Sequence, residues 1–123
     1  MRLLYVEDNR INALLFEEAL KLQKGLELRV AEDGAQAIEV ASAWAPEVLV
    51  LDSHLPDVSG AELLQRLRAL PQLAQVPAFM CSADAQPEDM ARAQAAGFMG
   101  YWTKPISIAT VLADLARLRP PQA

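Results

Sequence analysis

The sequence predicts an α/β fold in which a five-stranded parallel sheet is covered by helices on both faces. Short apolar runs and segments of helical periodicity alternate five times along the chain. Such an alternation requires right-handed crossover connections, and these produce a parallel sheet. The runs are almost wholly apolar, which is typical of strands buried on both faces. With 123 residues, the chain has a common size for one domain.

The predicted strands are short runs of aliphatic residues, and the last of them is weaker and rich in aromatic residues. They cover residues 3–6, 28–31, 48–51, 77–81 and 99–103. Four of the segments that follow the strands place apolar side chains on one face of a helix. In chain order these predicted faces are Leu15, Phe16, Ala19 and Leu20; Ala37, Ile38, Ala41 and Trp44; Leu63, Leu64, Leu67 and Leu70; and Ile108, Val111, Leu112, Leu115 and Leu118.

Capping signals predict where the helices begin. Ser59 and Glu62 fit a capping box, in which the serine hydroxyl and the glutamate carboxylate satisfy opposite backbone N–H groups. The remaining signals are Asn9 before the first helix, Asp33 and Gln36 at the second, Pro87 in the first turn of the fourth, Gly97 at its end, and Ser107 before the fifth.

Composition excludes several classes of protein. The chain has 11 Lys and Arg, 16 Asp and Glu, and no basic run, which argues against direct binding of nucleic acid. No apolar run approaches the roughly 18 residues that span a bilayer, and Glu7 comes too early for a signal peptide. A single cysteine, Cys81, excludes an internal disulfide. We therefore expect a cytoplasmic domain over residues 1–119 and a short polar tail over residues 120–123, with no membrane partner.

Polar residues follow four of the predicted strands. In open sheets of this kind, ligands bind beyond the carboxyl ends of the strands. One edge of the sheet would therefore collect these side chains from distant parts of the chain. They are Glu7 and Asp8 after the first strand, Asp52 after the third, Ser82 after the fourth and Lys104 after the fifth.

Three carboxylates at one edge repel one another, which raises their pKa values unless a cation intervenes. Oxygen ligands with open positions suit Mg²⁺, whereas zinc would need a set of Cys and His ligands that the chain lacks. The charges of the carboxylates, Mg²⁺ and Lys104 sum to zero. Asp52 is then the natural nucleophile for a phosphoryl group, whose developing charge the metal and the lysine stabilise. Ser82 offers a hydroxyl to a phosphoryl oxygen.

The chain resembles the receiver domain of two-component response regulators over essentially its whole length. Each motif is weak alone, but their order and spacing are specific to that family. The matching residues are Glu7-Asp8, Leu51-Asp52 followed by Leu-Pro and Gly60, Ser82-Ala83 thirty residues after Asp52, and Tyr101 three residues before Lys104-Pro105. The Glu-Asp-Asn start and the Lys-Pro-Ile end look like receivers attached to hybrid histidine kinases, whereas the Met before the first strand favours a stand-alone regulator.

The resemblance implies a flavodoxin-like fold with strand order 2-1-3-4-5. It also implies a Mg²⁺ ion held by Glu7 (largely through water), Asp8, Asp52 and the backbone carbonyl of His54. A histidine kinase or a histidine phosphotransfer protein would supply the phosphoryl group to Asp52, and the chain would catalyse only its own phosphorylation and dephosphorylation. Lys104 would pair with the phosphoryl group, and its peptide bond to Pro105 would be cis. We expect a monomer or a weak dimer.

The resemblance further implies a switch between two packings. Ser82 would move to hydrogen-bond the phosphoryl group, and the ring of Tyr101 would fill the space that it leaves. The output face would consist of the fourth helix, the fifth strand and the fifth helix. Apart from this face, Ile11 and Leu14 are displaced from the apolar side of the first helix. Our hypothesis is that they dock the helix carrying the donor histidine, together with Pro105 and Ile106.

Other readings of these residues remain open at this point. Asp52 could cap the turn before Pro56, Asp8 could begin a helix, and Ser82, Lys104 and Tyr101 could be a turn hydroxyl, a surface lysine and a packing aromatic. A Mg²⁺-dependent phosphatase of the haloacid dehalogenase kind also uses an aspartate nucleophile, but it needs a second aspartate where His54 stands. A degenerate receiver used only for binding would have lost part of the cluster. Dinucleotide binding finds no Gly-rich turn after the first strand.

Overall fold

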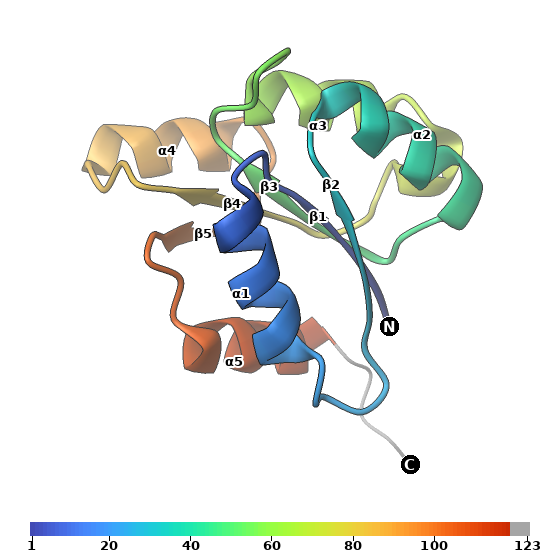
Figure 1. Cartoon of the computed structure of the whole chain (residues 1–123). Helices are drawn as coiled ribbons and strands as arrows, with labels where there is room; N and C mark the ends of the chain where they lie inside the picture. The colour runs from blue at the N-terminus through green and yellow to red at the C-terminus, as the bar shows by residue number, and fades with distance from the viewer. Residues whose placement is uncertain (119–123) are drawn as a thin grey trace.

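The computed structural model describes residues 1–118 and contains the predicted alternation of strands and helices (Figure 1). Residue 119 and the tail over 120–123 lie outside the described residues. The strands are β1 (Arg2–Val6), β2 (Glu27–Ala31), β3 (Val48–Asp52), β4 (Ala78–Ser82) and β5 (Gly100–Thr103). The helices are α1 (Arg10–Leu20), α2 (Gly34–Trp44), α3 (Gly60–Arg68), α4 (Pro87–Ala95) and α5 (Ile108–Leu118), with a 3-10 turn η1 (Pro71–Leu73) that the sequence did not predict. Within residues 1–118, none of these helices has the length and apolar character needed to cross a membrane.

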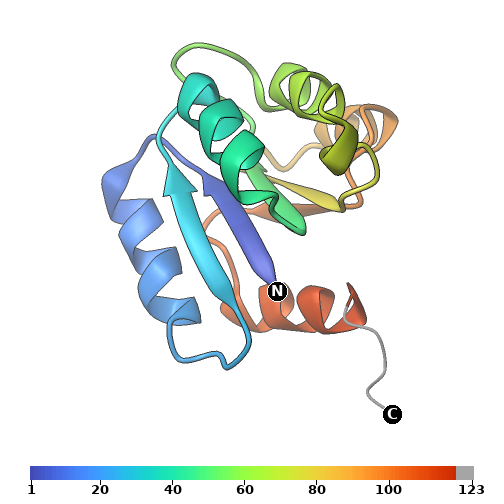
Figure 2. The same cartoon turned by 90° about the vertical axis from the view of Figure 1, so that its right-hand side faces the viewer.

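The five strands form one parallel sheet in the order β2-β1-β3-β4-β5, which confirms the expected order. Helices α2, α3 and α4 cover one face of the sheet, and α1 and α5 cover the other (Figures 1 and 2). The order reverses direction between β1 and β3. The carboxyl ends of these two neighbouring strands therefore open onto the crevice where open α/β sheets bind ligands.

The two faces of the sheet bury separate apolar cores, because successive side chains of a strand point to opposite faces. Leu49 and Leu51 of β3 pack in the core under α2, α3 and α4. Val48 and Val50 pack in the core under α1 and α5. Asp52 continues the second set along the strand. Its carboxylate therefore emerges on the side of α1 and α5.

The predicted caps begin the helices, with one exception in detail. The side chains of Asn9, Asp33 and Ser59 each accept a hydrogen bond from the backbone N–H three residues later. Only half of the capping box predicted at Ser59 is present, however. Glu62 does not return a bond to Ser59; its carboxylate instead lies 3.3 Å from Arg66 one turn later in α3.

The prediction that Leu15 belongs to the buried face of α1 is wrong. Ala13, Phe16 and Leu20 are the residues that α1 buries, at a spacing of three and four residues. Leu15 precedes Phe16 by about 100° of helical rotation and is 63% exposed. The helix thus presents a second apolar stripe to solvent, to which Ile11 and Leu14 also belong.

Candidate functional site

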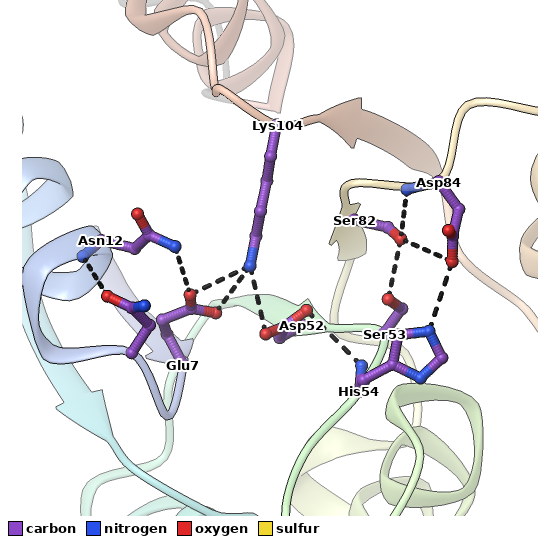
Figure 3. A network of polar contacts seen from close by, with 9 residues as sticks. Glu7, Asn12, Asp52, Ser53, His54, Ser82, Asp84 and Lys104 are labelled. Carbon is purple, nitrogen blue, oxygen red and sulfur yellow. Dashed lines mark hydrogen bonds and ion pairs between the residues drawn. The ribbon is translucent and has the colours of Figure 1, made fainter.

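The centre of the site is a pair of buried carboxylates held by one lysine (Figure 3). Glu7 follows β1 and Asp52 ends β3, and these strands are neighbours in the sheet. The two side chains are almost fully buried. The Nζ atom of Lys104, which follows β5, lies 3.0 and 3.1 Å from the two carboxylate oxygens of Glu7 and 3.2 Å from Oδ2 of Asp52. The sequence prediction that Glu7, Asp52 and Lys104 meet at one edge of the sheet is therefore confirmed.

The charges of this cluster are only partly balanced. Burial raises the pKa of Glu7 to about 7, and the neighbouring Asp52 adds to the rise, against hydrogen bonds from Asn12 and Lys104 that lower it. For Lys104, burial alone would lower the pKa, but the hydrogen bond to Glu7 and the charge of Asp52 outweigh it and raise the pKa. Two carboxylates thus share one ammonium group. Such a site favours one further cation.

Asp8 is the third acidic residue that the sequence analysis predicts for this site. It follows the buried Glu7 directly in the sequence and is itself exposed. Asn9, not Asp8, caps α1, because the Asn9 side chain accepts the N–H of Asn12 at 3.0 Å. The Asp8 carboxylate is therefore not used as the helix cap. The alternative role that the sequence allowed for Asp8 is excluded.

The donor set at this edge fits Mg²⁺. It consists of the carboxylate oxygens of the buried Glu7 and Asp52, and Mg²⁺ takes few carboxylates and keeps several waters. Asp8, the next residue after Glu7, is exposed. The carboxylate oxygens of Glu7 and Asp52 also come within 4.8 Å of each other and of the Cys81 sulfur. Cys81 is buried and bears a neutral thiol, because burial raises its pKa. The ligands available to a hard cation are thus the carboxylates, and Cys81 acts as a small apolar residue.

Ser82 lies beside this cluster but takes no part in it. Its buried hydroxyl accepts a hydrogen bond from the Ser53 hydroxyl at 2.8 Å and another from the backbone N–H of Asp84 at 3.1 Å. Its own proton is directed to Oδ2 of Asp84, 3.5 Å away. Figure 3 shows Ser82 grouped with Ser53 and Asp84, apart from the Glu7–Lys104–Asp52 group.

Tyr101 is connected to Ser82 through the loop after β4. The Tyr101 hydroxyl donates a hydrogen bond of 2.7 Å to the backbone carbonyl of Asp84. Tyr101, Ser82 and Ser53 line one cavity of about 190 Å³ between β4, α3 and α4. The two residues predicted to form a switch therefore border a common space, and Asp84 joins them.

His54 lies in the loop after β3, across from Asp84 in the loop after β4. Its ring is exposed, and Nε2 lies 3.3 Å from Oδ2 of Asp84. The backbone N–H of His54 points to Oδ1 of Asp52 at 3.5 Å. The Asp84 carboxylate thus contacts the Ser82 hydroxyl and the His54 ring. The backbone carbonyl of Asp84 accepts the hydrogen bond from the Tyr101 hydroxyl.

The loop after Asp52 is fastened at two points. A Cβ atom on Gly60 would lie 2.4 Å from the backbone oxygen of Asp52, so only glycine permits α3 to begin this close to Asp52. The Asp57 carboxylate accepts the N–H groups of Gly34 at 2.9 Å and Ala35 at 3.1 Å, at the start of α2. The hydrogen bond from Gly34 holds the pKa of Asp57 below its usual range.

The residues proposed for docking belong to α1 and to the segment after β5, and of the α1 residues proposed, neither Ile11 nor Leu14 lines the groove of Pro105 and Ile106. Ile11 and Leu14 are exposed, as predicted. The Lys104–Pro105 peptide bond is cis, as the resemblance implied. Pro105 and Ile106 line an open groove with the exposed Leu15 of α1.

Four residues of the site escaped the sequence analysis. Asn12 donates to Glu7 at 3.0 Å, and its position in the first turn of α1, directly after the acidic pair, was a usable signal. Ser53, Asp57 and Asp84 are polar loop residues one to five positions after Asp52 or Ser82. Their contacts depend on the conformations of two loops, which no periodicity in the sequence describes.

Comparison with known proteins identifies relatives of this chain. A family model described as response regulator receiver domain matches residues 3–116. The polar-differentiation response regulator DivK of Brucella anthropi is 32% identical over 103 residues, which cover 84% of this chain and 83% of that protein. The chemotaxis protein CheY4 of Vibrio cholerae has a structure that matches with a TM-score of 0.87 at 26% identity, over 96% of this chain and 98% of that one. A putative response regulator from Chloroflexus aurantiacus matches with the same TM-score and identity over 95% of each chain.

Proposed function

Because the chain belongs to the response regulator receiver domain family of two-component systems, we propose that Asp52 is its phosphoacceptor. The observation that carries the proposal is the position of Asp52. It is a buried carboxylate at the carboxyl end of the central strand β3, with its Oδ2 atom 3.2 Å from the ammonium group of Lys104. A carboxylate in this place can form an aspartyl phosphate, and the lysine offsets the charge that arrives.

The proposed reaction is a phosphoryl transfer from a phosphohistidine. A carboxylate oxygen of Asp52 forms a bond to phosphorus, the P–N bond to the imidazole breaks, and its electron pair stays on the nitrogen. Later attack by water on phosphorus restores the Asp52 carboxylate and releases inorganic phosphate. The chain thus catalyses only its own phosphorylation and dephosphorylation, and no separate substrate is turned over.

Receiver domains of this family bind Mg²⁺ at an acidic pocket. Here Glu7, Asp8, Asp52 and the backbone carbonyl of His54 would hold the ion, with Glu7 acting largely through water. When bound, the ion supplies positive charge to the phosphoryl oxygens during transfer. Lys104, which now pairs with Glu7 and Asp52, is close enough to turn to the phosphoryl group. Asn12 keeps the Glu7 carboxylate in position by its hydrogen bond.

A histidine kinase or a histidine phosphotransfer protein is the proposed donor, and α1 is its docking surface. The exposed Ile11, Leu14 and Leu15 form an apolar stripe on α1. The groove beside this stripe contains Pro105 and Ile106 and runs next to Lys104. An amphipathic helix laid along the stripe would therefore bring a histidine to the acidic edge. We place the reaction in the cytoplasm. The free thiol of Cys81 is compatible with that reducing compartment.

The proposed output is a change in the packing of α4, β5 and α5. Ser82 and Tyr101 border the cavity of about 190 Å³ that separates β4 from α4. Movement of Ser82 toward a phosphoryl group on Asp52 would alter the Asp84 contacts that now join the two residues. Phosphorylation biases such an equilibrium by the difference in its interactions with the two states.

Incubation with acetyl phosphate and Mg²⁺ tests the proposal. Intact-mass measurement should show one added phosphoryl group, which Asp52→Asn abolishes. An adduct that persists in Asp52→Asn contradicts the assignment. The same protein incubated with p-nitrophenyl phosphate should release no more than about one nitrophenolate per chain, since a phosphatase would turn over repeatedly. The residue two positions after Asp52 is His54, where a phosphatase of the haloacid dehalogenase kind needs an aspartate.

A further inference from the structure

Ser82 and Asp52 leave the sheet on opposite faces. Ser82 follows Ala78 and Met80 of β4, which belong to the core under α2, α3 and α4. Asp52 follows Val48 and Val50 of β3, which belong to the core under α1 and α5. The Ser82 hydroxyl must therefore turn around the end of the sheet before it can donate to a phosphoryl group on Asp52.

Ser53 holds the Ser82 hydroxyl on the face of the sheet opposite to the Asp52 carboxylate. Ser53 succeeds Asp52 and so points to the same face as Ser82, where its hydroxyl donates to the Ser82 oxygen at 2.8 Å. The Asp84 N–H, at 3.1 Å, takes the second acceptor position of that oxygen. Both acceptor positions of the buried Ser82 oxygen are therefore filled by groups of the protein. The shorter of the two bonds comes from a side chain, which a substitution can remove.

We propose that Ser53 is a positioning residue that holds Ser82 in its resting orientation and thereby opposes the phosphorylated state. The inference rests on the proposed function, because the movement that Ser53 opposes is that of Ser82 toward a phosphoryl group on Asp52. A receiver with an apolar residue directly after its phosphoacceptor would lack this restraint. In this chain, one hydroxyl sets how readily the switch responds.

The strength of the restraint follows from the space around it. The cavity of about 190 Å³ that Ser53 and Ser82 both line is large enough to admit water. When Ser82 leaves, the Ser53 hydroxyl is therefore solvated and not left unpaired. The restraint then has the net value of one hydrogen bond, which corresponds to a factor of roughly 2 to 10 in the equilibrium between the two positions.

Titration with beryllofluoride in the presence of Mg²⁺ tests this inference on the full chain. Beryllofluoride stands in for the phosphoryl group on Asp52, and the amide signals of Ser82 and Asp84 report the response. Ser53→Ala should lower the beryllofluoride concentration at half-saturation by roughly 2- to 10-fold. Ser53→Thr, which keeps the hydroxyl, should match the parent. Ser53→Cys, with a weak donor of similar shape, should fall between them and replaces Ser53→Ala if that variant does not fold.

A double-mutant cycle separates positioning from a general effect on packing. In a Ser82→Ala background, Ser53→Ala should leave the half-saturation unchanged, because the partner of Ser53 is gone. Ser42→Ala, on the exposed side of α2, is the matched control and should behave as the parent. A persistent effect of Ser53→Ala in the Ser82→Ala background overturns the inference, and so does equal or weaker binding by the single variant. Failure of the parent to bind beryllofluoride at all, by contrast, contradicts the proposed function.

Discussion

Lys104 contacts Glu7 more closely than it contacts Asp52. Its Nζ atom lies 3.0 and 3.1 Å from the two oxygens of Glu7 and 3.2 Å from the nearer oxygen of Asp52. The lysine thus neutralises the buried glutamate while it stays within hydrogen-bonding distance of Asp52. If the Lys104 side chain turns from Glu7 to a phosphoryl oxygen, another cation must neutralise Glu7 in its place.

Removal of Lys104 should destabilise the protein in the absence of Mg²⁺. At pH 8, Lys104→Met should lower the free energy of unfolding by about 1–3 kcal/mol, since two buried carboxylates lose their counter-charge. The lysine side chain is 20% exposed, which keeps the loss near the lower end. Urea unfolding measures the change, and Lys24→Met in the turn after α1 is the control. A loss no larger than that of the control would contradict the assigned role.

Stability without Mg²⁺ should fall as the pH rises from 5.5 to 8. The pKa of Glu7 is raised from 4.5 to about 7, so the protonated form stabilises the folded state. That stability is fully present below pH 4.5 and is lost as the pH rises through about 7. The expected loss is on the order of 1–3 kcal/mol, measured by urea unfolding in EDTA.

Mg²⁺ should restore more stability at pH 8 than at pH 5.5, because protons compete with the ion at the acidic edge. At ten times its dissociation constant the ion contributes about 1.4 kcal/mol. Glu7→Gln serves as the control for both measurements and should remove most of the pH dependence. A parent and a variant with equal pH slopes would rule out Glu7 as the titrating group.

Loss of the Asp57 carboxylate should loosen the start of α2. In Asp57→Ala the amide hydrogens of Gly34 and Ala35 lose their acceptor and should exchange faster with solvent. The pKa of Asp57 is lowered by the Gly34 bond, so its contribution to stability is lost only as the pH falls below the usual carboxyl range. Hydrogen exchange at neutral pH measures the effect. Glu39→Ala, on the exposed side of α2, should leave both amides as protected as in the parent.

Charge on the exposed stripe of α1 should block the protein donor only. Leu15→Asp should slow phosphorylation by a cognate histidine donor by about tenfold or more, as expected where an apolar interface contact is lost. Its rate with acetyl phosphate should stay the same, because Leu15 does not touch the carboxylates. Leu22→Asp is the matched control, since Leu22 is 87% exposed but lies beyond the end of α1. Equal slowing with both donors would mean that Leu15→Asp disturbs the site and not the docking.

The Tyr101 hydroxyl should couple the loop after β4 to strand β5. With beryllofluoride, we expect amide shifts over residues 82–94 and 100–104 and little change over residues 34–44. Tyr101→Phe removes the bond to the Asp84 carbonyl and should reduce the shifts in α4, and Tyr101→Ala should reduce them further. Two-dimensional NMR measures the pattern. If both variants respond as the parent does, the ring serves packing alone.

The sequence predicted the sheet, its order and the central carboxylates because these depend on regular features. Buried parallel strands are continuous apolar runs, and their carboxyl ends must meet at one edge. Asp52 and Lys104 could therefore be placed together although 52 positions separate them in the chain. The family resemblance added the strand order and the cis peptide bond at Lys104, neither of which follows from periodicity.

The sequence did not predict features that depend on the exact rotation of a helix or on the conformation of a loop. The spacing of Leu15, Phe16, Ala19 and Leu20 predicts one apolar face, but Leu15 lies about 100° of helical rotation from Phe16 and is exposed. The contacts of Ser53 and Asp84 depend on which way Ser82 turns at the end of β4. The alternation of side chains along the strands places Ser53 and Ser82 on one face of the sheet, but no spacing of residues encodes the rotamers that bring their hydroxyls together.

The two loops of the site are held in place unequally. The loop after β3 is firmly anchored, and the loop after β4 is the one that we expect to move on phosphorylation. Asp57 and Gly60 tie the segment after Asp52 to α2 and α3, whereas the loop after β4 rests on a few side-chain hydrogen bonds. The one cysteine of the chain, Cys81, is fully buried, so a thiol-reactive dye would select an introduced cysteine. A dye at Ser42→Cys on α2 would give a constant signal and one at Gln94→Cys on α4 a phosphorylation-dependent signal. If phosphorylation repacks α4 as proposed, the ratio of the two dye signals would report the phosphorylation of the chain.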